Sequence, residues 1–208
     1  MEIALRNVPQ VVGPVVVCPD VSGSMRSPVT GERAGATTAT RCVDVAALVA
    51  AAFLHQDPST RVLPFEHEVV KVKLQATVSV MENAQRLASV GGGGTDCSAP
   101  LRWLNQRGVR ARLVVLVSDN ESWIGSHSHG ATATLKEWTQ FKKHNPGAKL
   151  VCLDIQPYAS SQVPEREDIL NIGGFSDTVF TLIDRFAKDE LSPQHWVGLI
   201  ESQALNAA

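Results

Sequence analysis

Three short polar segments, far apart in the chain, carry the residue types that bind a hard divalent cation. The sequence reads DVSGS at positions 20–24, GGTD at 93–96 and SD at 118–119, and the first and last of these follow apolar runs. Mg²⁺ and Mn²⁺ prefer carboxylate and hydroxyl oxygens, and a hydroxyl fixes the geometry without adding charge. The sequence therefore predicts one metal site with five ligands: Asp20, Ser22, Ser24, Thr95 and Asp119.

These ligands also suggest what such a site would do. If the hydroxyl groups bind the ion directly while Asp20 and Asp119 act partly through water, the ion stays electrophilic and one position remains free. A carboxylate from a partner protein suits that position. We therefore expect Mg²⁺ (or Mn²⁺ or Ca²⁺) as the cofactor and a protein ligand that supplies an acidic residue. Each segment alone also fits a structural role, because Asp-x-Ser is a common turn or helix cap and glycine-rich loops are common connectors.

The elements that must position these segments alternate between strands and helices. Apolar, β-branched runs predict buried strands at 15–18, 112–117 and 149–155, a strand pair at 61–65 and 68–74, and a short edge strand at 173–175. Helices are expected at 41–55, 81–89, 97–107, 132–144, 178–187 and 195–204. This order predicts an α/β, Rossmann-like domain over residues 1–208, with a mainly parallel sheet flanked by helices on both faces. Asp20 and Asp119 then fall at carboxyl ends of strands, where such sheets bind ligands.

The bulk composition describes an ordinary soluble domain. The chain has 208 residues, 44% of them hydrophobic, and a formal net charge of −2, which argues against a surface built to track nucleic acid. No stretch approaches the roughly 18 apolar residues of a membrane span, and no secretory signal is visible. The four cysteines form no C-x-x-C pair and stand in apolar surroundings. We expect free buried thiols and a cytoplasmic location.

The three segments together resemble the metal-ion-dependent adhesion site of von Willebrand factor A domains. That motif consists of Asp-x-Ser-x-Ser, a later Gly-Gly-Thr and an apolar strand that ends in Asp. Carried over residue by residue, it matches Asp20, Ser22, Ser24, Thr95 and Asp119 in full. The resemblance covers nearly the whole chain and implies a Rossmann-like fold with the ion on the upper rim of the sheet.

A narrower resemblance is to the A domain of Ro (TROVE) proteins. It rests on DVSGSM at 20–25, GTDCSAP at 94–100, SDNESW at 118–123 and GGF at 173–175. Members of that family pair this domain with a ring of helical repeats that binds noncoding and misfolded RNA, and the resemblance implies a Ro-like ribonucleoprotein system. No helical repeats are present in this sequence. We therefore expect either an excised carboxyl-terminal domain or a free-standing relative.

Other residues near these segments offer further contacts. The possible rim or partner-binding residues are Asp96, Asn120, Glu121 and Trp123. A basic cluster surrounds Trp103 and suggests an alternative function, an RNA-associated module that contacts noncoding RNA through Arg102, Arg107, Arg110 and Arg112. The same arginines also fit a solvated helix face and turn.

The motifs of common enzyme classes are incomplete. The glycine run at 91–94 lacks the Lys-Ser/Thr of a phosphate-binding loop, and the sequence contains no G-x-S-x-G. His67-Glu68 begins like a zinc protease motif, but Lys71 stands where the second histidine belongs. His127 and His129 lie in a glycine- and serine-rich stretch that is typical of a solvated loop. We expect a binding module and no catalysis.

Overall fold

Five parallel strands form one sheet in the computed structural model, which describes residues 8–30, 38–119, 129–156, 166–176 and 178–191. The strands are β1 (Val15–Pro19), β2 (Arg61–Val62), β3 (Leu113–Ser118), β4 (Lys149–Asp154) and β5 (Ile169–Gly173). Their order in the sheet is β2-β1-β3-β4-β5, and each neighbouring pair is parallel. The predicted α/β class and the strands at the centre of the sheet are confirmed.

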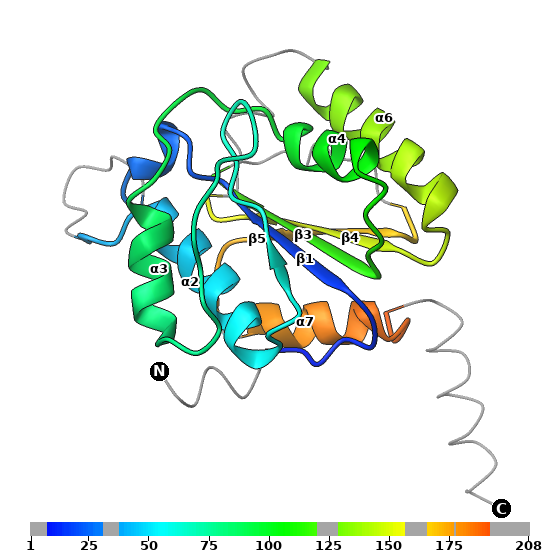
Figure 1. Ribbon diagram of the computed structural model, residues 1–208, viewed down its shortest axis with the longest axis horizontal. Coiled ribbons are helices and arrows are strands. Elements are labelled where there is room, and N and C mark those ends of the chain that lie inside the picture. The colour runs from blue at the N-terminus through cyan, green and yellow to red at the C-terminus, as the bar shows by residue number, and fades with distance from the viewer. Residues whose placement is uncertain (1–7, 31–37, 120–128, 157–165, 177, 192–208) are drawn as a thin grey trace, which may run out of the picture.

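Helices cover both faces of this sheet (Figure 1). On one face lie α2 (Cys42–Gln56), α3 (Val80–Ala88) and α7 (Thr178–Ala187), and on the other lie α4 (Ala99–Gln106) and α6 (His129–His144). Successive residues of β3 alternate between the two faces: Val115 packs with α2 and α7, whereas Leu116 packs with α4 and α6. The central strands are buried on both sides, which explains their uninterrupted apolar sequence.

Two of the predicted edge elements are wrong. Residues 68–74 form no strand: only an isolated antiparallel bridge joins Phe65 to Val69. The alternating pattern is nevertheless real, because Val70, Val72 and Leu74 pack against the core. The chain is held just after this segment, where the buried Asn83 bonds both the N–H and the carbonyl oxygen of Gln75.

The other edge strand begins earlier than predicted. It is β5, Ile169–Gly173, which pairs with β4 along its whole length and whose apolar residues the sequence analysis did not count. Among the described residues, no helix is long and apolar enough to cross a membrane. The predicted helix at 195–204 lies outside the described residues. All four cysteines are buried and none forms a disulfide, as predicted.

Candidate metal centre

Asp20 lies directly after β1, in the plane of the sheet and between two neighbours. Its N–H donates to the carbonyl oxygen of Val117 on one side (2.8 Å), and the next N–H, of Val21, donates to Phe65 on the other (2.8 Å). The Asp20 side chain is fully buried. Its Oδ1 accepts from the Ser22 N–H and its Oδ2 from the Ser118 hydroxyl, both at 2.8 Å. Backbone and side chain therefore hold this carboxylate in one orientation.

The next two predicted ligands converge on one point. After Asp20 the chain turns into η1, a single 3-10 turn (Ser24–Arg26) that the sequence analysis did not predict. This turn places the hydroxyl oxygens of Ser22 and Ser24 3.3 Å apart. Neighbouring ligands of an octahedral cation lie about 3.0 Å apart for Mg²⁺ and about 3.4 Å apart for Ca²⁺, given bonds of about 2.1 and 2.4 Å. The two hydroxyls thus have the spacing of neighbouring ligands.

The glycine-rich loop brings Thr95 to the same edge of the sheet. The Gly23 N–H donates to Gly93 and the Gly92 N–H donates to Val21, both at 2.9 Å. Gly91 and Gly92 have φ values of +77° and +115°, which other residues rarely adopt. At Gly91 a Cβ would also overlap the carbonyl oxygen of Val21. Glycine is therefore required for this loop to lie directly on the segment that carries the serines.

The Asp119 carboxylate repels two others at this edge, those of Asp20 and Asp154. The pKa of Asp20 is raised from 3.8 to about 6, mainly by burial. The hydrogen bonds from Ser22 and Ser118 lower this pKa, and the charge of the buried Asp119 raises it. Burial also raises the pKa of Asp154, at the end of β4, to about 7, again with a contribution from Asp119. A cation placed among these groups would favour their ionised forms.

The donors fit a hard, oxygen-binding cation better than a soft one. Within the described part of the chain, no group of three or more His, Cys, Asp or Glu side chains is placed to hold a metal. A site here would therefore depend on the hydroxyl groups of Ser22, Ser24 and Thr95 beside two carboxylates, as the sequence predicts. That donor set suits Mg²⁺, Mn²⁺ or Ca²⁺.

Among the predicted rim residues, the structure describes only Asp96. Its carboxylate accepts from the N–H and the hydroxyl of Ser98 (2.9 and 2.6 Å) and from Arg102 (2.9 Å). Burial raises the pKa of this carboxyl, but these hydrogen bonds outweigh burial and leave the pKa below its ordinary value. Asp96 thus holds the start of α4. Asn120, Glu121 and Trp123 lie outside the described residues.

The predicted basic cluster is spread from the first turn of α4 to the start of β3. Arg102, in the first turn, bonds Asp96 and Ser98 beside the glycine-rich loop. Arg112, just before β3, bonds the carbonyl oxygen of Gly147 and faces Asp189. Near Trp103 the structure places the predicted Arg107 and, from β2, Arg61, with guanidinium carbons 4.2 and 5.8 Å from the ring centroid. Arg110 is exposed in the loop after α4.

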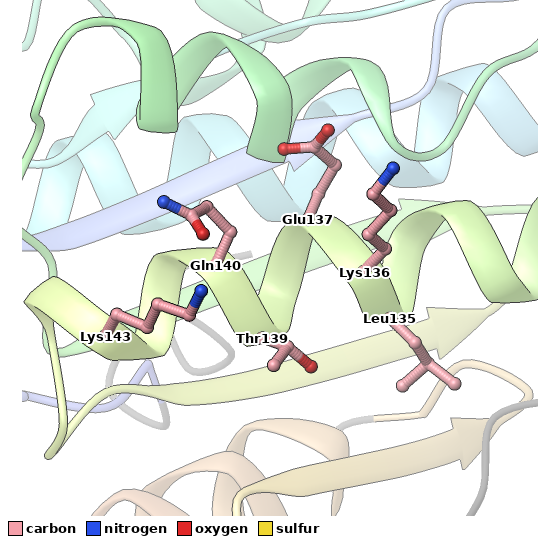
Figure 2. A pocket seen from close by; sticks show the side chains of 6 residues that line it. All are labelled: Leu135, Lys136, Glu137, Thr139, Gln140 and Lys143. Atoms are coloured by element: carbon pink, nitrogen blue, oxygen red, sulfur yellow. The ribbon is translucent and has the colours of Figure 1, made fainter.

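Two surface hollows contain none of the five predicted ligands. One, of about 630 Å³, lies along the outer side of α6, and Figure 2 shows that its labelled side chains all come from that helix. The other, of about 320 Å³, lies between the end of α2, β2 and the 72–76 segment. The predicted ligands lie instead along the carboxyl edge of the sheet.

Sequence analysis missed three polar residues of this edge. Ser118 binds Asp20, and its position before Asp119 marked it only as part of a motif. Asp154 follows an apolar run as Asp20 and Asp119 do, so the same rule would have found it. Glu66 bonds the Gly93 N–H at 2.7 Å, and no local pattern signals this contact across 27 positions.

Comparisons with known proteins agree on one family. The model of the Ro60 von Willebrand A domain matches residues 15–187. The chain is 27% identical over 172 residues to the RNA-binding protein RO60 of Deinococcus radiodurans, covering 83% of this chain and 31% of that protein. It is 23% identical over 174 residues to the RNA-binding protein RO60 of Caenorhabditis elegans, covering 83% and 26%. The chain thus spans less than a third of these relatives.

A solved structure shows the same fold. The crystal structure of the Deinococcus radiodurans Ro (Rsr) protein superposes with a TM-score of 0.69 at 25% sequence identity. The alignment covers 91% of this chain and 37% of that one.

Proposed function

Since the chain belongs to the Ro60 von Willebrand A domain family, we propose that it is a binding module of a Ro-like, RNA-associated system that works through a divalent cation. The ion is held by Asp20, Ser22, Ser24, Thr95 and Asp119. An acidic side chain of a partner protein completes its coordination. The proposed function involves no catalysis.

One observation carries the proposal: two hydroxyl oxygens at the spacing of neighbouring ligands stand beside buried, mutually repelling carboxylates. Burying Asp20 without a counter-charge is unfavourable, as its raised pKa indicates. A fold that needed only a cap for the turn at Ser22 would gain more from an asparagine. A buried aspartate next to a second one is explained by a cation that both help to bind.

The contacts of Asp20 also bear on the need for a partner. Both of its carboxylate oxygens already accept hydrogen bonds, from Ser22 and Ser118. This favours contact with the ion through water, while the neutral hydroxyls bind directly. The ion then keeps much of its positive charge and attracts a further carboxylate.

Metal binding is tested by thermal unfolding in EDTA and then in excess Mg²⁺, Mn²⁺ or Ca²⁺. An ion at about a hundred times its Kd stabilises the folded state by about 2.7 kcal/mol. We expect this gain for the wild type and its loss in Thr95→Val, which removes one hydroxyl without changing the shape of the side chain. Thr77→Val, at an exposed threonine away from the site, is the matched control. An equal gain in Thr95→Val and wild type would contradict the ligand assignment.

The acidic partner is tested separately with peptides. A peptide with one glutamate should bind the wild type in Mg²⁺ and lose binding in EDTA, whereas the matched glutamine peptide should not bind. Binding that is equal for both peptides would refute a role for the partner's carboxylate.

A second candidate function is direct contact with RNA, because both RO60 relatives are named RNA-binding proteins. The structure supports a different surface from the one the sequence predicts, with the guanidinium groups of Arg107 and Arg61 over the Trp103 ring. Guanidinium groups contact phosphates, and guanidinium and aromatic planes stack with unpaired bases.

This candidate is tested by titrating the protein with a single-stranded RNA oligonucleotide at several salt concentrations. We expect Arg107→Ala to weaken binding and to flatten its salt dependence, because one phosphate contact is lost. Arg86→Ala, on α3 at the opposite face, is the matched control. Undetectable or salt-insensitive binding by the wild type would discard the candidate.

A further inference from the structure

Glu66 lies beside the predicted metal ligands although it is distant from them in sequence. After β2 the chain continues along β1: the Leu63 N–H donates to Val17, and the Phe65 N–H donates to Pro19. Phe65 is also bridged to Asp20. The sheet therefore delivers the residue after Phe65 to the edge where the ligands gather.

Glu66 contacts the glycine-rich loop on both sides of Thr95. Its Oε2 accepts from the Gly93 N–H at 2.7 Å, and its main-chain oxygen accepts from the Asp96 N–H at 2.9 Å. The side chain is only 15% exposed, with Oε1 facing His67 Nδ1 at 3.2 Å. One residue thus fixes both ends of the short segment that carries the threonine hydroxyl.

The fit between Glu66 and the loop is tight. A Cβ at position 93 would lie 2.9 to 3.0 Å from the carboxylate atoms of Glu66, so the carboxylate would have to shift away from the loop if another residue stood there. At Gly94 nothing lies within 4 Å of such a Cβ. The four glycines at 91–94 leave the loop with much conformational freedom, which the fold must restrict before Thr95 can act as a ligand.

We infer that Glu66 is a positioning residue of the metal site: it sets the affinity for the cation by holding the loop that carries the Thr95 hydroxyl. Glu66 is not itself a ligand in this role. The inference rests on the proposed function, since it presupposes a cation at the site. A hydrogen bond to an ionised acceptor is among the stronger ones in proteins, and its loss corresponds to about a ten- to a hundred-fold rise in Kd.

The test is a titration with Mn²⁺, followed by electron paramagnetic resonance of the free ion, on wild type, Glu66→Ala, Glu66→Gln and Glu68→Ala. We expect Glu66→Ala to raise the Kd for Mn²⁺ about ten-fold or more. Glu66→Gln should restore most of the affinity, because its amide oxygen can still accept from Gly93. Glu68 is an exposed acid two residues away, and its loss should change nothing.

A second variant keeps the test valid if Glu66→Ala folds poorly. Gly93→Ala adds a methyl group against the Glu66 carboxylate, so this single substitution should weaken Mn²⁺ binding. In a Glu66→Gln background the neutral amide meets the same methyl group, and the weakening should persist. Thermal unfolding in EDTA reports folding separately for each variant.

The possible outcomes separate this inference from the proposed function. No Mn²⁺ binding by the wild type would refute the metal site itself. Binding by the wild type with equal affinity in Glu66→Ala would leave the metal site intact and overturn the role of Glu66. Equal weakening in Glu66→Ala and Glu68→Ala would also overturn it, because charge near the site would then explain the effect without the contact to Gly93.

Discussion

Replacing Asp20 with asparagine should make the metal-free protein more stable while it abolishes the response to Mg²⁺. The asparagine oxygen can accept from the Ser22 N–H, and its amide can donate to the Ser118 hydroxyl, so both hydrogen bonds of Asp20 have a counterpart. What the substitution removes is a buried negative charge beside Asp119.

The magnitude follows from the pKa of Asp20, which rises from 3.8 to about 6 on folding. One pH unit corresponds to about 1.4 kcal/mol, so the ionised group destabilises the folded state by about 3 kcal/mol at neutral pH. The folded state binds this proton more tightly than the unfolded chain does. The free energy of unfolding therefore falls as the pH rises from about 3.8 to about 6. At pH 5 about half of the destabilisation is already gone.

The assay is thermal unfolding of wild type and Asp20→Asn in EDTA, at pH 7.5 and at pH 5. We expect the variant to be about 1–3 kcal/mol more stable at pH 7.5, and this advantage should shrink by about 1.4 kcal/mol at pH 5. Each kcal/mol corresponds to about 2–4 °C in Tm for a domain of this size. With Mg²⁺ at pH 7.5 only the wild type should gain. A variant less stable than wild type in EDTA at pH 7.5, or an advantage independent of pH, would refute the reasoning.

Two further predictions concern the loop and the proton. Gly91→Ala should lower the free energy of unfolding, as measured by urea denaturation, by more than Gly174→Ala does. Both glycines have a positive φ, which disfavours alanine by about 1–2 kcal/mol. Only at Gly91 would the added Cβ also meet Val21. Equal losses would show that the loop does not lie tightly on that segment. Mn²⁺ affinity should fall as the pH drops below about 6, because protons compete for Asp20, and calorimetric titration at pH 7.5 and 5 would measure the change. An affinity independent of pH would contradict the assignment of Asp20.

The centre of the fold was predictable from local sequence. The strand Leu113–Ser118 is buried on both faces, so its residues before Ser118 had to be apolar, and this pattern can be recognised without the structure. The edges were not predictable in the same way. Residues 68–74 alternate like a strand, yet their backbone makes only the isolated bridge from Val69 to Phe65. The main chain that follows is bound at Gln75 by Asn83 of a neighbouring helix.

The ligands of the candidate site could also be predicted from local sequence. Asp20, Ser22, Ser24, Thr95 and Asp119 could be named from residue type and order alone, because a hard cation needs oxygen donors and parallel strands bring their carboxyl ends to one edge. Their status as ligands remains a prediction, as does the identity of the ion.

Only the tertiary structure decided which residues support that site and which arginines share a surface. Glu66 and Gly93 meet across 27 positions, and Arg61 of β2 joins Trp103 of α4. Conversely, Arg102 and Arg112 are near in sequence, but Arg102 lies in the first turn of α4 and Arg112 lies just before β3, bound to Gly147. The physical reason is that a motif is a local property of the chain, whereas a contact between loops depends on strand order and register, which form only when the whole sheet assembles.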